Sequence, residues 1–110
     1  MAAKNTIKII SMSASSNQTE VVGTPPLNEV WVIKKFGCAD MNTGDNKSSV
    51  FILKYGTDNI RIVTLTGAIK ELDISHEITG DGTKELKVFI QNSSGGAKQV
   101  GFWIDGYSRE

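Results

Sequence analysis

Apolar and polar residues alternate with a period of two along most of this 110-residue chain, which is the pattern of β-strands. The clearest case is the segment from Lys84 to Tyr107, where two alternating runs flank a loop rich in Ser and Gly. Pairing Ile90 with Val100 and Val88 with Phe102 puts both apolar sets on one face, because opposed residues of antiparallel strands share a face. These two runs are therefore predicted to form an antiparallel hairpin.

The rest of the chain is predicted to form further short strands. Roughly seven or eight are expected in all, with turn signals about every 8–12 residues and no helical periodicity. The runs at 50–55 and 60–65 flank residues 56–59, which have the length and composition of a hairpin loop. The connections at 13–26 and 37–48 are long enough to cross between two sheets. The predicted fold class is all-β, an antiparallel β-sandwich with jelly-roll or Greek-key topology.

A single domain is expected over residues 1–110, because this length can bury a core without disulfides or metal ions. Residues 1–5 are expected to be an arm in front of the first strand. No apolar run has the length of a signal-peptide core or of a membrane span of about 20 residues, so neither is predicted.

Three of the predicted strands, at 30–33, 50–55 and 60–65, are apolar on both faces. A sandwich needs only its inner faces apolar, and soluble monomers rarely expose large apolar patches. The outer face is therefore predicted to be covered by a second copy of the chain in a closed symmetric homo-oligomer. The residues assigned to this interface are Trp31, Ile52, Val63 and Phe89.

Trp103 is the aromatic residue that we predict to be exposed on the surface. In the predicted hairpin it lies opposite Lys87 and two residues before Asp105, on the second face of the strand. An exposed ring beside polar groups suits stacking on a sugar ring, because such a site combines apolar area with a few placed polar groups. Trp103, Lys87 and Asp105 are therefore the predicted ligand-binding residues, with a glycan as the ligand.

The composition narrows the classes of function. Twelve basic and twelve acidic residues leave no net charge, so the usual electrostatic signal of nucleic-acid binding is missing. One cysteine, Cys38, and one histidine, His76, cannot build a Cys/His zinc site or an intramolecular disulfide. We therefore predict no nucleic-acid partner, no metal and no cofactor, and the sequence leaves the role of Cys38 open.

The candidate catalytic residues do not combine into a site. His76 alternates with Leu72, Ile74 and Ile78, and a histidine on an apolar face is more often a hydrogen-bonded core or interface residue than a general base. Ser75 points to the opposite face, so no triad can be drawn. Carboxylate pairs fall on polar strand faces or in hairpin loops rather than in a cleft. The chain is predicted not to be an enzyme.

The run from Asp40 to Asn46 begins like a calcium-binding loop, with oxygen-bearing side chains two residues apart. An EF-hand is excluded, because its twelfth position is Phe51 where a bidentate glutamate is required. An irregular calcium site stays open there, against a turn whose polar side chains bind their own backbone.

The closing segment carries a family resemblance. An Asn-Ser-Ser-Gly loop followed by Val-Gly-Phe-Trp-Ile-Asp-Gly-Tyr at 100–107 resembles the end of small jelly-roll modules of phage particles and tail fibres. Residues 25–36, Pro-Pro-Leu-Asn-Glu-Val-Trp-Val-Ile-Lys-Lys-Phe, are similar to the strand that opens those modules. The resemblance implies a non-enzymatic, oligomeric virion component, a trimer by analogy, with other virion or surface proteins as partners. The expected location is the virion or the cytoplasm.

Two functional hypotheses follow from the sequence, beside the disfavoured one of an enzyme that works through His76 and Asp73 or Glu77. The first is a structural or adhesion module that self-associates through an apolar outer face and presents loops 37–48 and 93–97 to a partner. The alternative is a carbohydrate-binding module that uses Trp103.

Overall fold

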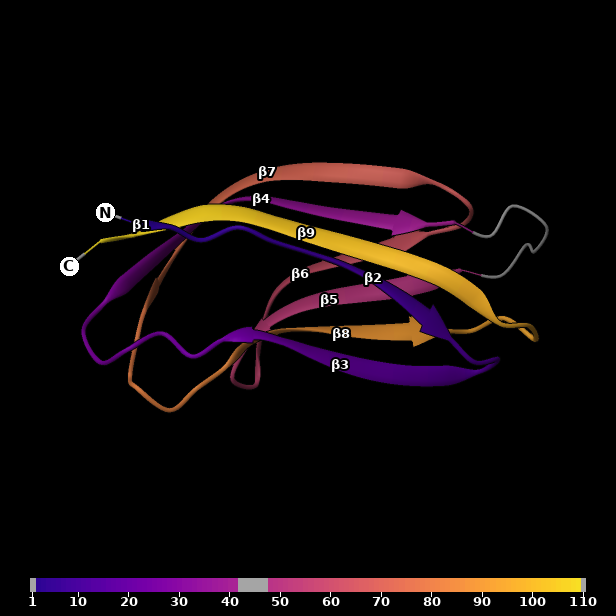
Figure 1. Cartoon of the computed structure of the whole chain (residues 1–110), viewed down its shortest axis with the longest axis horizontal. Helices are drawn as coiled ribbons and strands as arrows, with labels where there is room; N and C mark the ends of the chain where they lie inside the picture. The colour runs from indigo at the N-terminus through magenta and orange to yellow at the C-terminus, as the bar shows by residue number, and fades with distance from the viewer. Residues whose placement is uncertain (1, 42–47, 110) are drawn as a thin grey trace.

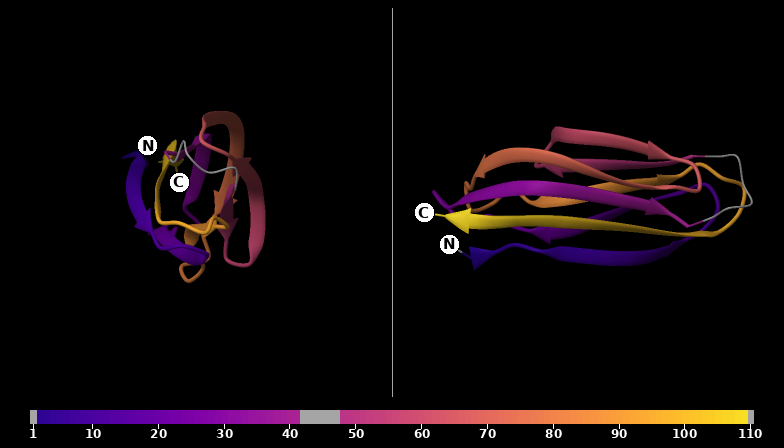
Figure 2. Two further views of the ribbon diagram at one scale, coloured as in Figure 1. Left: turned by 90° about the vertical axis from the view of Figure 1, so that its right-hand side faces the viewer. Right: turned by 90° about the horizontal axis from the view of Figure 1, so that it is seen from above.

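The computed structural model describes residues 2–41 and 48–109, which contain nine strand segments and no helix (Figure 1). The strands form two antiparallel sheets and run along the long axis of the molecule (Figure 2). In sheet A, β1 and β2 both pair with β9, followed by β4 and β7, and in sheet B the order is β3-β8-β5-β6. The bounds are β1 Ala2–Ala3, β2 Thr6–Met12, β3 Ser16–Gly23, β4 Val30–Asp40, β5 Ser49–Tyr55, β6 Asp58–Leu65, β7 Ile69–Thr79, β8 Leu86–Asn92 and β9 Lys98–Arg109.

Successive strands change sheet at almost every connection. Only β1 and β2, which continue one another along β9, and the β5–β6 hairpin stay within a sheet. Counting β1 and β2 as one interrupted strand gives eight strands in two four-stranded layers, which is a jelly roll. The predicted antiparallel β-sandwich is confirmed, and of the two topologies left open by the sequence, jelly roll and Greek key, the chain has the jelly roll.

The predicted hairpin at 84–107 is wrong. β8 pairs with β3 and β5 in sheet B, whereas β9 pairs with β2 and β4 in sheet A. Val88, Ile90, Val100 and Phe102 are all 0% exposed, so each does point into the core, but from two facing sheets. Alternation shows which face of a strand is buried, and that pattern is the same whether two strands pair or face each other.

The second predicted hairpin forms, with a different register. Its loop is the two residues Gly56–Thr57, with Gly56 at φ 60°, and Tyr55 pairs with Asp58. A bulge in β6 follows, so that Ile60 and Val63 both point into the core although they are three residues apart. The alternation of apolar and polar residues in the sequence does not indicate this bulge.

Two connections and the N-terminal arm differ from the prediction. The strands β2 and β3 are separated only by residues 13–15, and β4 continues to Asp40, so the expected connection at 37–48 starts later. Residues 42–47 lie outside the described part of the chain, as does most of the candidate calcium run. The expected N-terminal arm pairs with β9, Ala2 opposite Ser108 and Ala3 opposite Tyr107.

The core lies between the two sheets. Its largest fully buried side chains include Phe36, Phe51, Phe102, Ile33 and Leu53, and burying each stabilises the fold by about 1.5–3 kcal/mol. Both termini lie at one end of the sandwich, here called the terminal end, and the turns at 13–15, 66–68 and 93–97 lie at the other, the turn end (Figure 1).

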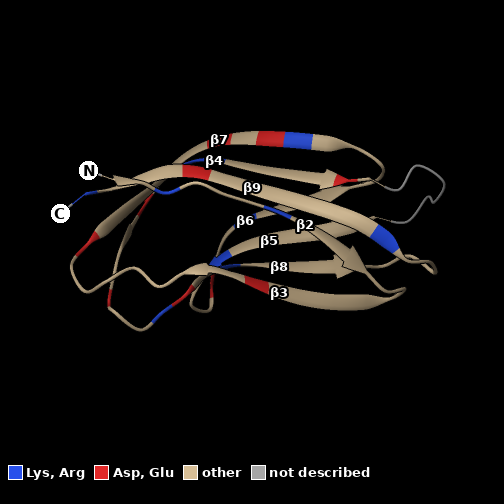
Figure 3. Cartoon of the chain, in the orientation of Figure 1, with Lys and Arg blue, Asp and Glu red and all other residues tan. Residues whose placement is uncertain are grey.

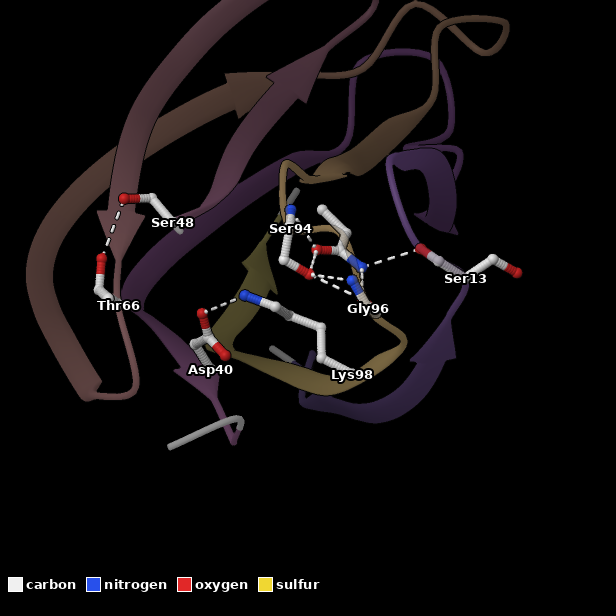
Figure 4. Close-up of polar contacts among 8 residues, drawn as sticks. Ser13, Asp40, Ser48, Thr66, Ser94, Gly96 and Lys98 are labelled. Carbon is white, nitrogen blue, oxygen red and sulfur yellow. Dashed lines mark hydrogen bonds and ion pairs between the residues drawn. The ribbon is translucent and has the colours of Figure 1, made fainter. Parts of the chain in front are cut away.

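The core is polar at the turn end. Lys98 and Asp40 form an ion pair of 3.0 Å between Nζ and Oδ2, and both side chains are 0% exposed. Ser94 lies beside them (Figure 4) and forms a buried hydrogen-bonded cluster with Asn92.

Candidate functional site

The outer surface of sheet A, here called face A, carries two neighbouring rows of mostly apolar residues. Strand pairing places Ile9, Gly101, Ala39 and Ile69 in one row across β2, β9, β4 and β7. The next row toward the terminal end is Ile7, Trp103, Gly37 and Glu71. Of these side chains Ile7 is 74% exposed, Ile9 64% and Ile69 73%, so large isoleucines stand in solvent on both edges of the sheet.

Trp103 lies over Gly37 in the middle of face A. A Cβ atom at Gly37 would lie 1.8 Å from Trp103 Cε2 and 2.1 Å from its Cζ2, so only glycine leaves room for the ring. The indole Nε1 donates a hydrogen bond of 2.7 Å to Glu71 Oε2, which fixes the ring in its plane. One ring face therefore rests on the sheet, and the residue is held in a single orientation.

A charged row follows on face A toward the terminal end. Asp105 and Asp73 flank Lys35 in the strand pairing, and Lys35 Nζ donates to Glu71 Oε1 at 3.3 Å. Hydrogen bonds from Trp103 and Lys35 lower the pKa of Glu71, and the bond to Glu71 raises the pKa of Lys35. These groups are exposed, so their pairing contributes little to stability. The charged row nevertheless contains two carboxylates, Asp73 and Asp105, for the one cation Lys35.

Two hollows open on face A. One of about 520 Å³ lies at the side of Trp103 and is lined by Asn5, Thr6, Ile7 and Asp105 as well. A smaller one of about 170 Å³ lies over the first apolar row, between Ile9 and Ile69. The larger hollow combines an aromatic ring with a carboxylate and an amide, and the smaller is bounded by the apolar rows.

The outer surface of sheet B, here called face B, is also partly apolar. Its central row is Thr19, Phe89, Ile52 and Ile62, and Ile62 is 59% exposed. The next row toward the terminal end is Val21, Lys87, Lys54 and Asn59. The two lysines are direct neighbours across β5 and β8, at the blue ends of these strands in Figure 3.

The structure separates the predicted ligand-binding residues. Trp103 and Asp105 do point outward on face A, two residues apart. Lys87 lies on face B, on the opposite side of the sandwich. Its grouping with Trp103 depended on the hairpin that does not form, and the cation near Asp105 is Lys35 instead. The sequence interpretation missed Lys35, which lies far from Trp103 along the chain.

The residues assigned to an oligomer interface also fall in two places. Ile52 and Phe89 are paired neighbours on face B and are half-buried. Trp31 and Val63 are only 7% and 5% exposed and belong to the core. Trp31 packs against Gly23 at the terminal end, with Lys4 Nζ 4.8 Å from its ring centroid.

The most exposed isoleucines were not among the sequence candidates. Ile7 and Ile9 belong to the run Ile-Lys-Ile-Ile at 7–10, which is apolar on both faces of an edge strand. That two-sided pattern is the signal that could have identified them. Ile69 sits at the start of β7 and carries no comparable signal.

Other candidate chemistry is sparse in the described residues. His76 alternates with its apolar neighbours as expected and is half-buried. Burial raises the pKa of the Cys38 thiol to about 12, and its side chain is 0% exposed. Within residues 2–41 and 48–109 no group of three or more His, Cys, Asp or Glu could hold a metal ion. The same residues contain no helix with the length and hydropathy of a membrane span.

Comparison with known proteins gives structural likenesses only. No protein-family model matches the sequence, and no curated protein is similar to it. A solved structure from Bacillus endospore appendages, described as a novel family of disulfide-linked pili, is 8% identical with a TM-score of 0.53, and the match covers 96% of this chain and 88% of that one. The insecticidal delta-endotoxin Cry8Ea1 from Bacillus thuringiensis is 12% identical with a TM-score of 0.51, over 93% of this chain and 20% of the toxin chain.

These likenesses show that the fold is shared, and at such identities they show nothing more. A chain of infectious bursal disease virus is 10% identical with a TM-score of 0.32, and the match covers 94% of this chain and 30% of that one. The resemblance to phage particles and tail fibres therefore stays a prediction.

Proposed function

We propose that this chain is a non-enzymatic structural module that self-associates through its outer sheet faces. The observation that carries the proposal is the exposure of Ile7, Ile9 and Ile69 around Trp103 on face A. Monomeric soluble proteins seldom leave contiguous apolar surface of this kind in water, and such patches usually mark contact sites. Fully burying one such side chain contributes about 1.5–3 kcal/mol.

The contact between copies is non-covalent. The appendage structure that shares this fold comes from disulfide-linked pili, but this chain has one cysteine in all, Cys38. That residue is fully buried and its thiol is held in the protonated form, so it is neither accessible nor reactive toward another copy. Apolar area and charge must therefore supply the association.

A virion is the setting that we propose for this module, with other virion or surface proteins as further partners. The support is the resemblance of residues 25–36 and 100–107 to phage modules, together with the jelly-roll fold that the resemblance implied. A trimer is the stoichiometry that the same resemblance suggests.

The test is the solution mass of the purified chain, measured by light scattering across a dilution series down to low micromolar concentration. We expect the oligomer to persist over most of the dilution series and to dissociate only at the lowest concentrations. A chain that is monomeric throughout the series would overturn the proposal.

A carbohydrate-binding module is the second candidate, and the geometry of Trp103 favours it. Its ring is held flat on Gly37, beside a hollow of about 520 Å³ that also contains Asn5 and Asp105. A fixed ring face next to carboxylate and amide groups suits a sugar, which offers C–H groups to the ring and hydroxyls to the polar atoms.

A glycan array probed with wild type, Trp103→Ala and Phe89→Ala tests this second candidate. Phe89 is the matched control, because it is an aromatic residue on the opposite face. A defined sugar signal that only Trp103→Ala removes would support the module. Silence of the wild type across the array, or a signal that survives Trp103→Ala, would exclude a glycan site at this ring.

A further inference from the structure

On each outer face an apolar row lies next to a charged row, and the charged row is nearer the terminal end. From the turn end toward the terminal end, face A presents apolar rows containing Ile9 and Trp103 and then the charged row at Asp105. Face B presents a mixed row with Val50 and Gln91, then its apolar row at Ile52 and then the row at Lys54. Successive rows on one face of a strand are two residues, or about 6.6–6.8 Å, apart. The spacing between apolar and charged rows is therefore matched on the two faces.

The charged rows have opposite sign. On face A, Asp73 and Asp105 flank Lys35, and the carboxylate of Glu71 reaches Lys35 from the neighbouring row. The exposed Lys34 beside them donates to Ser75 Oγ, so carboxylates still outnumber cations. On face B, Lys54 and Lys87 are neighbours, and the outward positions beside them are the uncharged residues Val21 and Asn59. The acidic segments of β7 and β9 and the basic ends of β5 and β8 are marked in Figure 3.

We propose that face A of one copy packs on face B of the next copy, with the long axes pointing the same way. This arrangement rests on the proposed self-association and states which surfaces make it. It places the Trp103 row of face A on the Ile52 row of face B and the acidic row against the two lysines at the same time. The Ile9 row then lies against the row of face B that contains Val50 and Gln91. Packing face A on another face A with the long axes parallel would instead bring carboxylates against carboxylates, and with the long axes antiparallel it would leave the acidic rows without a basic row opposite them.

The contact leaves a free face at each end of the assembly. Face A and face B lie on opposite sides of the sandwich, so a copy bound through face A still offers face B to a further copy. Such head-to-tail contacts form open stacks unless a rotation between copies closes them. The structure therefore points to an extending stack of this chain rather than to the closed trimer that the resemblance implies.

Single substitutions on each face test the arrangement. Ile9→Glu places a charge in the apolar row of face A, and Ile62→Glu does so on face B. Leu27→Glu is the matched control, because Leu27 is 69% exposed on the connection between β3 and β4, away from both faces. All three sites are exposed, so the variants are expected to keep the wild-type fold, which circular dichroism and thermal melting check.

We expect wild type and Leu27→Glu to form concentration-dependent stacks, and each face variant alone to be a monomer. Mixing Ile9→Glu with Ile62→Glu leaves one intact face A and one intact face B, so the mixture should give a 1:1 dimer and nothing larger. If Ile62→Glu alone keeps the wild-type mass, or if the mixture stays monomeric while wild type assembles, the arrangement is wrong but self-association stands. If wild type itself is monomeric, the proposed function fails as well.

Charge reversal tests the alignment of the rows within that mixed dimer. Adding Lys54→Glu and Lys87→Glu to the copy that offers face B should weaken the dimer at least tenfold. Adding Asp73→Lys and Asp105→Lys to the copy that offers face A should then recover most of the affinity. An unchanged dissociation constant after the lysine reversals would overturn the opposition of the charged rows.

Discussion

The two parts of the core are built in different ways. Along most of the sandwich it consists of apolar side chains such as Phe36, Phe51 and Phe102, which are fully buried and bring no polar atoms. At the turn end it contains Asp40 and Lys98, a buried ion pair contributed by neighbouring strands of sheet A. Apolar burial is non-directional and tolerates rearrangement, whereas a buried polar cluster requires defined partners at defined positions.

Asn92 is the centre of the polar cluster. Its Oδ1 accepts hydrogen bonds from the amide of Ser94 at 2.9 Å and from its hydroxyl at 2.7 Å. Its Nδ2 donates to the carbonyl oxygens of Ser13 at 2.8 Å and Gly96 at 3.1 Å. One side chain therefore ties the turn between β2 and β3 to the turn between β8 and β9 (Figure 4). The apolar part stabilises the sandwich, and the polar part fixes how its turns lie.

The largest expected effect comes from removing one member of the buried ion pair. Lys98→Met keeps the length of the side chain but leaves the Asp40 carboxylate buried beside an apolar group. Removing one member of a buried pair costs about 3–5 kcal/mol, because the Asp40 carboxylate stays buried and loses the charge of Lys98. Urea denaturation monitored by tryptophan fluorescence measures the loss in free energy of unfolding.

The double variant Asp40→Leu with Lys98→Met is its control. It removes both charges, makes the turn end resemble the rest of the core, and should recover most of the lost stability. If Lys98→Met lowers the free energy of unfolding by less than about 1 kcal/mol, water must reach the ion pair. The two parts of the core would then differ less than their burial indicates.

The second expected effect is at Asn92. Asn92→Ala leaves the amide of Ser94 without its partner. The Ser94 hydroxyl still bonds Gly96 O and the Ser13 carbonyl still accepts from Ser16 Oγ. We expect a loss of about 1–3 kcal/mol, the cost of an unsatisfied buried polar group. Hydrogen exchange should rise in both turns and leave the apolar strands protected. Gln91→Ala, an exposed neighbour on the same strand, should change stability by less than about 0.5 kcal/mol.

The apolar part of the core is the part that the sequence predicts well. Period-two alternation identified the inward residues of most strands, including Val88 and Val100, and with them the β-sandwich. It could not identify the strand partners, because facing strands and paired strands bury the same alternate residues. The hairpin at 84–107 failed for this reason, and the other hairpin formed with a shorter loop than the expected 56–59 and with a bulge in β6.

The polar end and the outer faces were harder to predict. Asp40 and Lys98 are 58 residues apart, and neither has a local pattern that indicates burial. Trp103 and Asp105 were assigned correctly to an outer face, because alternation fixes orientation. Lys87 was assigned to the wrong one, because only the pairing of whole strands decides which sheet a residue belongs to.

The smallest expected effect concerns Cys38, an ionisable group in the apolar part. Burial alone raises the pKa of its thiol to about 12, because no charged group there compensates a thiolate. In the unfolded chain the pKa is about 8.5, so above that pH the unfolded state releases a proton that the folded state keeps. Stability is therefore complete below about pH 8.5 and falls as pH rises toward 12.

Between about pH 8.5 and about pH 9.5 the free energy of unfolding should fall by about 1 kcal/mol more in wild type than in Cys38→Ala. The two proteins are compared by how steeply the free energy of unfolding changes with pH. The loss of packing in Cys38→Ala is the same at every pH and does not affect this slope. An aromatic disulfide reagent should likewise fail to modify the native thiol and react at once in urea. Equal slopes for the two proteins would mean that the thiolate is stabilised in the folded state, so that the middle of the core, like the turn end, can hold a charge.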